Sequence, residues 1–314
     1  MKYYITIDGG TTNTRVNLVA GEKVVDARKI SLGAKDCTNG SHHLKDAIIA
    51  EIDNICLQRS ITFNNIEAVI ASGMISSECG LFPLEHLSAP VGISELHLGL
   101  VKAENILDNL PCYFIPGVKR LTKNPETTDM MRGEETEALG LLNDRNLENT
   151  VLILPGSHSK HIYIDKDGKI SNFKTMLTGE MISALANGTI LKNTVRLDYD
   201  RFDSSALSAG YEAAESLGLN DALFRVRIMK NLFSNSDIEC YSFFIGAIME
   251  AEVRSLKASG AKAAIIGGKA SLREPLAYLL RYKTELNVTA LTDEKTENAA
   301  AIGAVKIFEY GEEK

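Results

Sequence analysis

The chain has 314 residues, of which 45% are hydrophobic and 24% are charged, and its formal net charge is -7 at pH 7. This length accommodates two domains of roughly 100–200 residues, and the composition is that of a globular protein rather than a disordered or fibrous one. The acidic balance, without any cluster of Lys and Arg, argues against a nucleic-acid partner.

The sequence also predicts no membrane partner, because it contains no apolar run of membrane-spanning length. Its N-terminus enters a strand directly instead of presenting a signal segment, so we expect a cytoplasmic protein. The five cysteines are scattered and never form a C-x-x-C pair, which indicates neither a disulfide framework nor a zinc site.

The first stretch, residues 3–19, predicts a hairpin with unusual chemistry at its tip. Residues 3–7 and 15–19 alternate as strands do, and a tight connection joins them. Glycines let backbone amides approach an anion, hydroxyls can donate to phosphate oxygens, and a carboxylate can hold hydrated magnesium. The tip is therefore either an ordinary turn or a phosphate clamp. Its polar and glycine residues are Asp8, Gly9, Gly10, Thr11, Thr12, Asn13 and Thr14.

The rest of the first half predicts a mixed sheet with covering helices. We expect a third antiparallel strand over 24–30, a helix over 44–58 and a short buried strand over 68–71. The hydroxyl-rich loop 72–77 that follows can face a ligand or be a plain surface turn. An apolar run over 110–115 comes next, and the polar residues 119–129 predict a loop.

The segment from Met131 to Leu142 predicts a helix, because acidic residues crowd its start and apolar residues its end. Those acids can be an ordinary helix N-terminus or catalytic carboxylates.

A second hairpin repeats the first. Residues 151–154, 161–165 and 170–175 predict three strands, and the turn between the first two contains Gly156 and Ser157. This turn follows Gly10 and Thr11 by about 146 positions. Two equivalent hairpins can grip a polyphosphate from both sides. In the second tip, His158 and Lys160 are either groups suited to a terminal phosphate or solvated loop residues.

The second half continues with predicted helices over 181–191, 222–233 and 241–258, and residues 193–208 are expected to be irregular. A strand over 263–266 meets Gly267 and Gly268, where bare backbone can lie against a ring or a ribose. A helix is expected to begin at Pro275, and another to span 297–310.

The order of these parts resembles the actin, sugar kinase and heat-shock chaperone superfamily. More narrowly, five segments look like the 2-dehydro-3-deoxygalactonokinase family, in the same order over nearly the whole chain. They read IDGGTTNTR, ASGMISS, MRGEETEALG, LPGSHSKHI and FKTMLTGE.

The resemblance implies an α/β fold of two ribonuclease-H-like domains, with mixed five-stranded sheets and helices on both faces, flanking an ATP cleft. Residues 1–145 would form the N-terminal domain with the sugar-acid pocket and the first connecting helix. Residues 146–314 would form the C-terminal domain with the second phosphate hairpin and the adenosine loop. The terminal helix 297–310, with Ala301 and Gly303, would cross the hinge.

The resemblance also implies the ligands. ATP and Mg²⁺ are the expected cofactors, with Asp8 as the partner of the metal. The nucleotide is expected at Asp8, Gly10, Thr11, Thr12, Asn13, Gly156, Ser157, His158, Gly267 and Gly268. The sugar acid is expected at Ser72, Gly73, Met74, Arg132 and Gly133, where Arg132 can pair with its carboxylate or form a structural ion pair.

The implied reaction is phosphorylation of the terminal hydroxyl of 2-dehydro-3-deoxy-D-galactonate to its 6-phosphate, in galactonate catabolism. Lys160 would neutralise charge, because such transfers depend on positioning and electrostatics. Glu134 is the preferred general base, and the next candidates are Glu135, about 100° further around the helix, and Glu180.

Two departures from the superfamily pattern stand out. Gly9 occupies a position where relatives often carry a bulky aromatic residue. The second phosphate loop lacks the Asp that many superfamily members place there, which leaves Asp8 as the stronger metal candidate.

Alternatives remain at this level. The acceptor can be another sugar or keto-deoxy sugar acid, since C4 stereochemistry rests on a few contacts. A chaperone-like or actin-like ATPase without an acceptor would normally carry an additional partner-binding surface. Oligomeric state stays open, with a homodimer among the choices.

Overall fold

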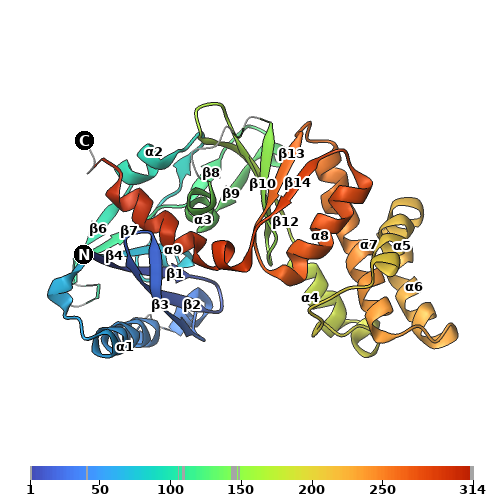
Figure 1. Ribbon diagram of the computed structural model, residues 1–314, viewed down its shortest axis with the longest axis horizontal. Coiled ribbons are helices and arrows are strands. Elements are labelled where there is room, and N and C mark those ends of the chain that lie inside the picture. Colours follow the sequence, from blue (N-terminus) through green and yellow to red (C-terminus); the bar gives the residue numbers. More distant parts are fainter. Residues whose placement is uncertain are drawn as a thin grey trace. The chain divides into compact units, whose positions relative to one another are not determined.

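The computed structural model describes residues 2–39, 42–104, 106–107, 110–142, 147 and 149–311. The chain divides into two compact units (Figure 1). Unit 1 comprises residues 1–146, 165–172 and 294–314, and unit 2 comprises residues 147–164 and 173–293. The predicted domain boundary at 145/146 lies outside the described residues.

Unit 1 is built on a six-stranded mixed sheet of order β3-β2-β1-β4-β7-β6. The strands β1, β4 and β7 run parallel, and β2, β3 and β6 are antiparallel to their neighbours. The prediction of five strands was wrong here, because β6 extends the edge beyond β7. The strands are β1 (Tyr3–Gly9), β2 (Thr14–Ala20), β3 (Lys23–Ile30), β4 (Ile66–Gly73), β6 (Val101–Ala103) and β7 (Cys112–Phe114).

The helix α1 (His42–Arg59) packs on this sheet through the predicted stripe of Leu44, Ile48, Ile52 and Ile55, which is buried. Unit 1 also contains a small sheet of β5 (Leu87–Ser88), β8 (Val118–Arg120) and β9 (Asp129–Met131), and the short helix α2 (Ile93–Leu98).

The predicted loop over 119–129 is confirmed for residues 121–128, and its ends belong to β8 and β9, which pair as an antiparallel hairpin. Its end is closed by polar bonds: Asn124 caps the short helical turn Pro125–Thr127 through the Glu126 amide, and the Thr122 hydroxyl lies 2.7 Å from that of Thr127. Side chains that close such a turn leave no periodic signal in the sequence.

Helices α3 (Glu134–Leu141) and α9 (Asp293–Glu309) cross within unit 1 at two glycines. A Cβ on Gly140 would lie 1.8 Å from the Ala299 carbonyl oxygen, and one on Gly303 would lie 1.9 Å from that of Thr136. The predicted small-residue helix therefore allows backbone-to-backbone approach.

Unit 2 repeats the opening of unit 1. Its sheet has the order β12-β11-β10-β13-β14, with β10, β13 and β14 parallel. The predicted repeat of three consecutive strands in each half is confirmed, as is the five-stranded sheet in this half. The strands are β10 (Thr150–Leu154), β11 (Ser159–Ile164), β12 (Ile170–Met176), β13 (Ala263–Ile266) and β14 (Asn287–Ala290).

Five helices accompany this sheet in the described part of unit 2: α4 (Thr178–Gly188), α5 (Ser204–Leu217), α6 (Leu219–Leu232), α7 (Asp237–Lys257) and α8 (Ala270–Lys283). Helix α5 begins inside the segment predicted to be irregular, because Asp203 caps it by accepting from the Ala206 amide. Helix α8 begins at Ala270, so Pro275 lies inside the helix and does not start it.

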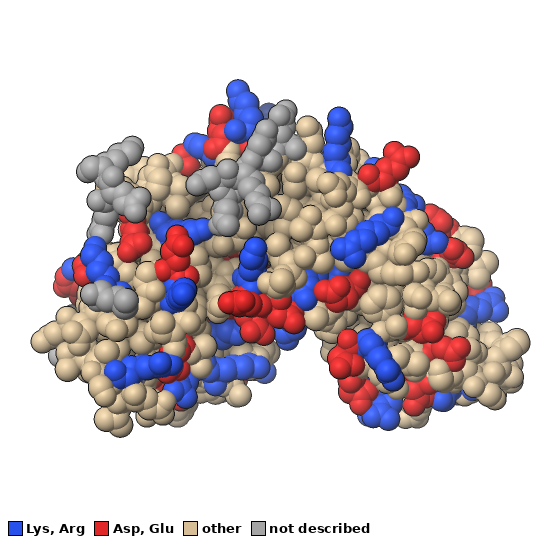
Figure 2. Space-filling model, viewed as in Figure 1, with Lys and Arg blue, Asp and Glu red and all other residues tan. Residues whose placement is uncertain are grey.

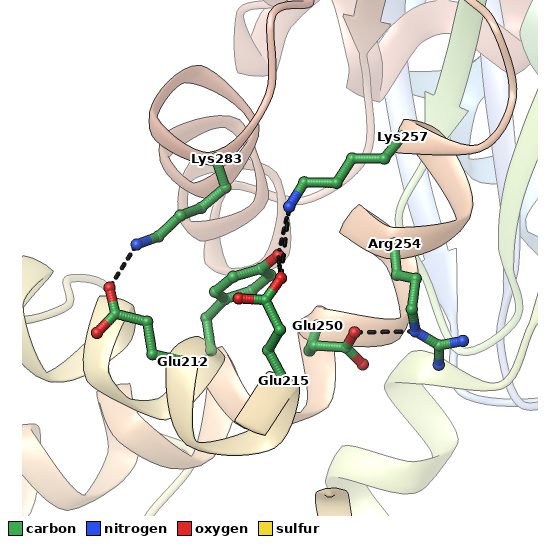
Figure 3. Close-up of polar contacts among 7 residues, drawn as sticks. Glu212, Glu215, Glu250, Arg254, Lys257 and Lys283 are labelled. Atoms are coloured by element: carbon green, nitrogen blue, oxygen red, sulfur yellow. Dashed lines mark hydrogen bonds and ion pairs between the residues drawn. The ribbon is translucent and has the colours of Figure 1, made fainter. Parts of the chain in front are cut away.

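Charged contacts fasten α5 to α7 and α8 (Figure 3). Lys283 pairs with Glu212 at 2.6 Å, and Lys257 lies 3.5 Å from Glu215. Both lysine ammonium groups lie over the Tyr211 ring. On the face drawn in Figure 2, Lys and Arg are interspersed with Asp and Glu. Among the described residues, no helix is both long and apolar enough to cross a membrane.

Candidate active site

The tip of the first hairpin is held by backbone hydrogen bonds. The Gly10 amide donates to the Asn13 carbonyl at 2.8 Å, while Ala34 donates to the Gly10 carbonyl at 3.0 Å and Lys35 to that of Thr11 at 3.1 Å. The side chains of Thr11 and Thr12 remain exposed. The tip is thus a fixed turn whose exposed Thr11 and Thr12 hydroxyls can donate to an anion.

Packing beneath this hairpin accounts for Gly9. A Cβ at this position would lie 2.6 Å from the Ile75 Cβ and 2.8 Å from the Ile75 backbone nitrogen. No side chain fits there unless the short helical turn Met74–Ser76 moves. Ile75 therefore occupies the space beside Gly9 that an aromatic side chain would need.

Two glycines with positive φ bring three segments of unit 1 together. Gly73 has a φ of 80°, and a Cβ there would lie 2.5 Å from the Gly9 carbonyl oxygen and 3.2 Å from Asp8 Oδ1. Gly133 has a φ of 108°, and its Cβ would lie 3.1 Å from the Gly73 Cα. The acceptor loop (residues 72–77, predicted to contact the sugar acid), the first hairpin and the start of α3 therefore meet, with Ser72 buried and Met74 partly exposed.

Carboxylates gather at this meeting point. Burial raises the pKa of Asp8, and the nearby Arg15 charge opposes that rise. Burial, followed by the Asp8 and Glu134 carboxylates, raises the pKa of Glu137 to about 8. The sequence reasoning missed Glu137, although its i, i+3 spacing from Glu134 places both on one face of α3.

The two predicted base candidates lie in different surroundings. Glu134 is partly exposed, and its Oε2 accepts from the Arg132 amide at 3.0 Å. Glu135 is fully buried; its carboxylate accepts from the Gly133 amide at 2.8 and 2.9 Å and from the Thr136 hydroxyl at 3.0 Å. Burial, followed by the Glu134 charge, raises the pKa of Glu135 to about 7. Glu134 is thus the more accessible of the two.

The Arg132 guanidinium is hydrogen-bonded to the segment 76–86. It donates to the Ser76 carbonyl at 2.7 Å, to the Leu84 carbonyl at 2.8 Å and to the Ser76 hydroxyl at 2.9 Å, and it lies 3.2 Å from His86 Nδ1. Burial, followed by the Arg132 charge, lowers the pKa of His86 to about 4. The Arg132 N–H groups that were predicted to bind a substrate carboxylate thus donate to the protein itself. Through Ser76, Arg132 holds the acceptor loop to the start of α3.

In unit 2, the residues at the second hairpin tip differ in exposure. Ser157 and His158 are exposed, and His158 Nε2 lies 3.1 Å from Glu180 Oε1 on α4. Lys160, in contrast, is buried, with 4% of its surface exposed, and its ammonium donates to the Thr175 hydroxyl at 2.6 Å. The alternative that Lys160 is a solvated loop residue is therefore wrong.

The glycine pair after β13 packs on the same tip. Gly268 has a φ of 72°, and a Cβ there would lie 2.5 Å from the Pro155 carbonyl oxygen. The Gly267 amide donates to the Ile153 carbonyl at 2.8 Å. The buried Arg273, which the sequence did not single out, donates to the Gly268 carbonyl at 2.9 Å. Within unit 2, the structure therefore joins the predicted adenosine loop to the second phosphate hairpin.

The first unit offers carboxylates that suit magnesium. Within the described residues, no group of three or more His, Cys, Asp or Glu side chains has the arrangement of a protein-only metal site. Magnesium bound through one or two carboxylates plus substrate phosphates needs no such group. Asp8 fits this role, because a cation beside it would relieve its repulsion with Glu137.

Comparisons with known proteins agree along most of the chain. The chain is 28% identical to the 2-dehydro-3-deoxygalactonokinase of Escherichia coli K12 over 260 residues, covering 81% of this chain and 80% of that protein. It is 26% identical to a probable 2-dehydro-3-deoxygalactonokinase of Rhizobium meliloti over 236 residues, covering 74% and 69%.

Solved structures share the fold. A candidate 2-dehydro-3-deoxygalactonokinase from Sinorhizobium meliloti superposes with a TM-score of 0.79 at 22% identity, covering 98% of both chains. The activator of 2-hydroxyisocaproyl-CoA dehydratase from Clostridium difficile, solved with ADPNP, gives a TM-score of 0.53 at 14% identity, covering 99% and 96%.

The family model described as 2-keto-3-deoxy-galactonokinase matches residues 8–307, from the first hairpin to the last turn of α9. The prediction of the family, and with it of a sugar-acid kinase, is confirmed. The chain belongs to the 2-keto-3-deoxy-galactonokinase family.

Proposed function

We propose that the protein transfers the γ-phosphoryl group of ATP to the terminal hydroxyl of 2-dehydro-3-deoxy-D-galactonate and forms the 6-phosphate, a step in galactonate catabolism. The observation that carries this proposal is the family match over residues 8–307, which includes both hairpin tips. The curated relatives named for this activity support the same acceptor.

Each unit is proposed to be a ribonuclease-H-like domain that contributes to nucleotide binding. Strand orders β3-β2-β1-β4 in unit 1 and β12-β11-β10-β13 in unit 2 support this, since each hairpin tip lies where the first antiparallel pair turns. A structure of the same fold was solved with ADPNP bound, which supports ATP as the nucleotide.

The nucleotide contacts are assigned by chemistry. The Thr11 and Thr12 hydroxyls of the first tip would donate to phosphate oxygens. Ser157 and His158 of the second tip, both exposed, would do the same for the terminal phosphates. The bare backbone of Gly267 and Gly268 would lie against the adenosine.

Lys160 acts on the phosphates from a distance in this proposal. Its buried ammonium supplies positive charge beneath the second tip, where water screens the charge less than at the surface. Magnesium, when bound with ATP, would be held through Asp8 and would neutralise phosphate charge.

Glu134 is proposed as the residue that receives the hydroxyl proton of the acceptor. It is the partly exposed carboxylate of the pair at the start of α3, whereas Glu135 is buried and its carboxylate accepts from the Gly133 amide. The acceptor is proposed to lie against Ser72, Gly73, Met74 and Gly133, whose loops meet beside Glu134.

Two measurements test this function. A coupled assay of ADP release is run with 2-dehydro-3-deoxy-galactonate, its gluconate epimer and common hexoses. We expect release only with a keto-deoxy sugar acid, and fastest with the galactonate; release that does not depend on an acceptor contradicts the kinase proposal.

The second measurement concerns the base. Glu134→Gln should retain ATP and sugar-acid binding and lower kcat about 10²- to 10⁴-fold, the usual contribution of a general base. Turnover within a few fold of wild type would move the role to another carboxylate, with Glu135→Gln and Glu137→Gln as the next variants.

A further inference from the structure

A buried polar group under the second hairpin has no part in the function proposed so far. His161 on β11 and Glu252 on α7 approach within 2.7 Å, with 0% and 2% of their side chains exposed. The Thr178 hydroxyl, at the first position of α4, donates to the other Glu252 oxygen. Burial disfavours the charged carboxylate, but the bonds from His161 and Thr178 outweigh it and lower the pKa of Glu252.

This group joins the elements that support the hairpin tip. His161 directly follows Lys160, which bonds on the other side to Thr175 of β12. Thr178 directly precedes the two residues whose amides contact the tip: Gly179 donates to the Gly156 carbonyl at 3.1 Å, and Glu180 to that of Ser157 at 3.2 Å. A Cβ on Gly179 would lie 2.4 Å from the Gly156 oxygen. The start of α4 thus packs directly against the tip.

Stability alone does not account for a charged group at this place. A buried ion pair is often no more stabilising than apolar residues of similar volume. One carboxylate that accepts directional hydrogen bonds from β11 and α4 fixes the position and rotation of both elements relative to α7, whereas apolar packing is not directional.

We propose that Glu252, acting through Thr178 and His161, is a positioning residue for the tip 156–158 and thereby for the terminal phosphates of ATP. The inference rests on the proposed function in one respect, the assignment of this tip to those phosphates. Glu252 touches no substrate; it acts by holding the start of α4.

The test compares four variants of the full chain. Thr178→Val removes the hydroxyl at nearly constant shape, Thr178→Ser keeps it, and Glu252→Gln removes the charge. Glu250→Gln is the matched control, because Glu250 lies on α7 two residues away and pairs with Arg254 at 2.9 Å (Figure 3). Affinities for Mg·ATP and for AMP are measured by calorimetry or by competition with a fluorescent nucleotide.

We expect Thr178→Val and Glu252→Gln to weaken ATP binding about tenfold, the effect of one lost buried hydrogen bond, while AMP binding stays within about twofold. Thr178→Ser and Glu250→Gln should bind ATP as wild type does. Unchanged ATP affinity in Thr178→Val, or equal loss of ATP and AMP affinity, would overturn the proposal. If Glu252→Gln does not fold, the Thr178 pair decides.

These binding measurements need no acceptor, so they separate the inference from the proposed function. A wild-type protein that phosphorylates no sugar acid would refute the function and leave the comparison of ATP with AMP intact. A wild-type protein that is active, with variants that bind ATP normally, would refute only the positioning role.

Discussion

The crossing of α3 and α9 predicts that alanine is not tolerated at Gly140. Its Cβ would lie 1.8 Å from the Ala299 carbonyl oxygen, and real Cβ contacts essentially never fall below 3.0 Å. The helices would have to separate by roughly 1.2 Å at this point, because the Ala299 carbonyl is backbone and a Cβ has no torsion that would move it away.

The expected cost is about 2 kcal/mol. Overpacking of this kind costs about 1–3 kcal/mol, and the upper part of that range applies because backbone must move. The higher helix propensity of Ala stabilises the helix by at most about 1 kcal/mol relative to Gly, which offsets only part of the overpacking cost. For a unit of this size, about 2 kcal/mol lowers the melting temperature by about 4–8 °C.

Differential scanning calorimetry of Gly140→Ala measures this shift. The control is Gly188→Ala at the end of α4, where a Cβ meets no atom within 4 Å, so its melting temperature should equal or exceed that of wild type. Gly303→Ala pushes the same helices apart, so the double variant should lose less than the sum of the single losses. A melting temperature of Gly140→Ala at or above that of wild type would refute the crossing geometry.

Three further predictions concern unit 1. Because burial raises the pKa of Glu135 to about 7 and that of Glu137 to about 8 from an ordinary 4.5, the folded chain holds more protons than the unfolded chain between pH 4.5 and 8. The free energy of unfolding should therefore fall as pH rises through this window, and Glu137→Gln should flatten the slope measured by urea unfolding; an unchanged slope contradicts the assignment. Gly9→Ala should lower the melting temperature, because its Cβ would lie 2.6 Å from the Ile75 Cβ; an unchanged value would show that the turn yields freely. Arg132→Lys should raise KM for the sugar acid more than KM for ATP in steady-state kinetics, because an ammonium cannot replace the forked donation to the Ser76 and Leu84 carbonyls; equal changes would contradict a role confined to the acceptor loop.

Local patterns in the sequence predicted much of the fold. The apolar stripe of α1, the two opening hairpins and the strand 263–266 each have a period or a turn chemistry that neighbouring residues determine. Helix α5 escaped prediction because its start depends on one capping side chain, Asp203, in a run of small and polar residues.

The candidate site was only partly predictable for a different reason. The contacts that shape it join residues far apart in the chain: Gly140 meets Ala299, Arg132 reaches Ser76, and His161 pairs with Glu252. Such pairs leave no periodic trace in a single sequence. Gly9 shows this well, since its absence of a side chain is explained only by Ile75, 66 positions further along.

The most direct test of the central claim is the identity of the product. The protein is incubated with Mg·ATP and 2-dehydro-3-deoxy-D-galactonate, and the product is examined by phosphorus–proton correlation NMR. A phosphate ester coupled to the protons of C6, formed in equal amount to ADP, is the predicted result. Inorganic phosphate with unmodified sugar acid, or an ester at another carbon, would contradict the account.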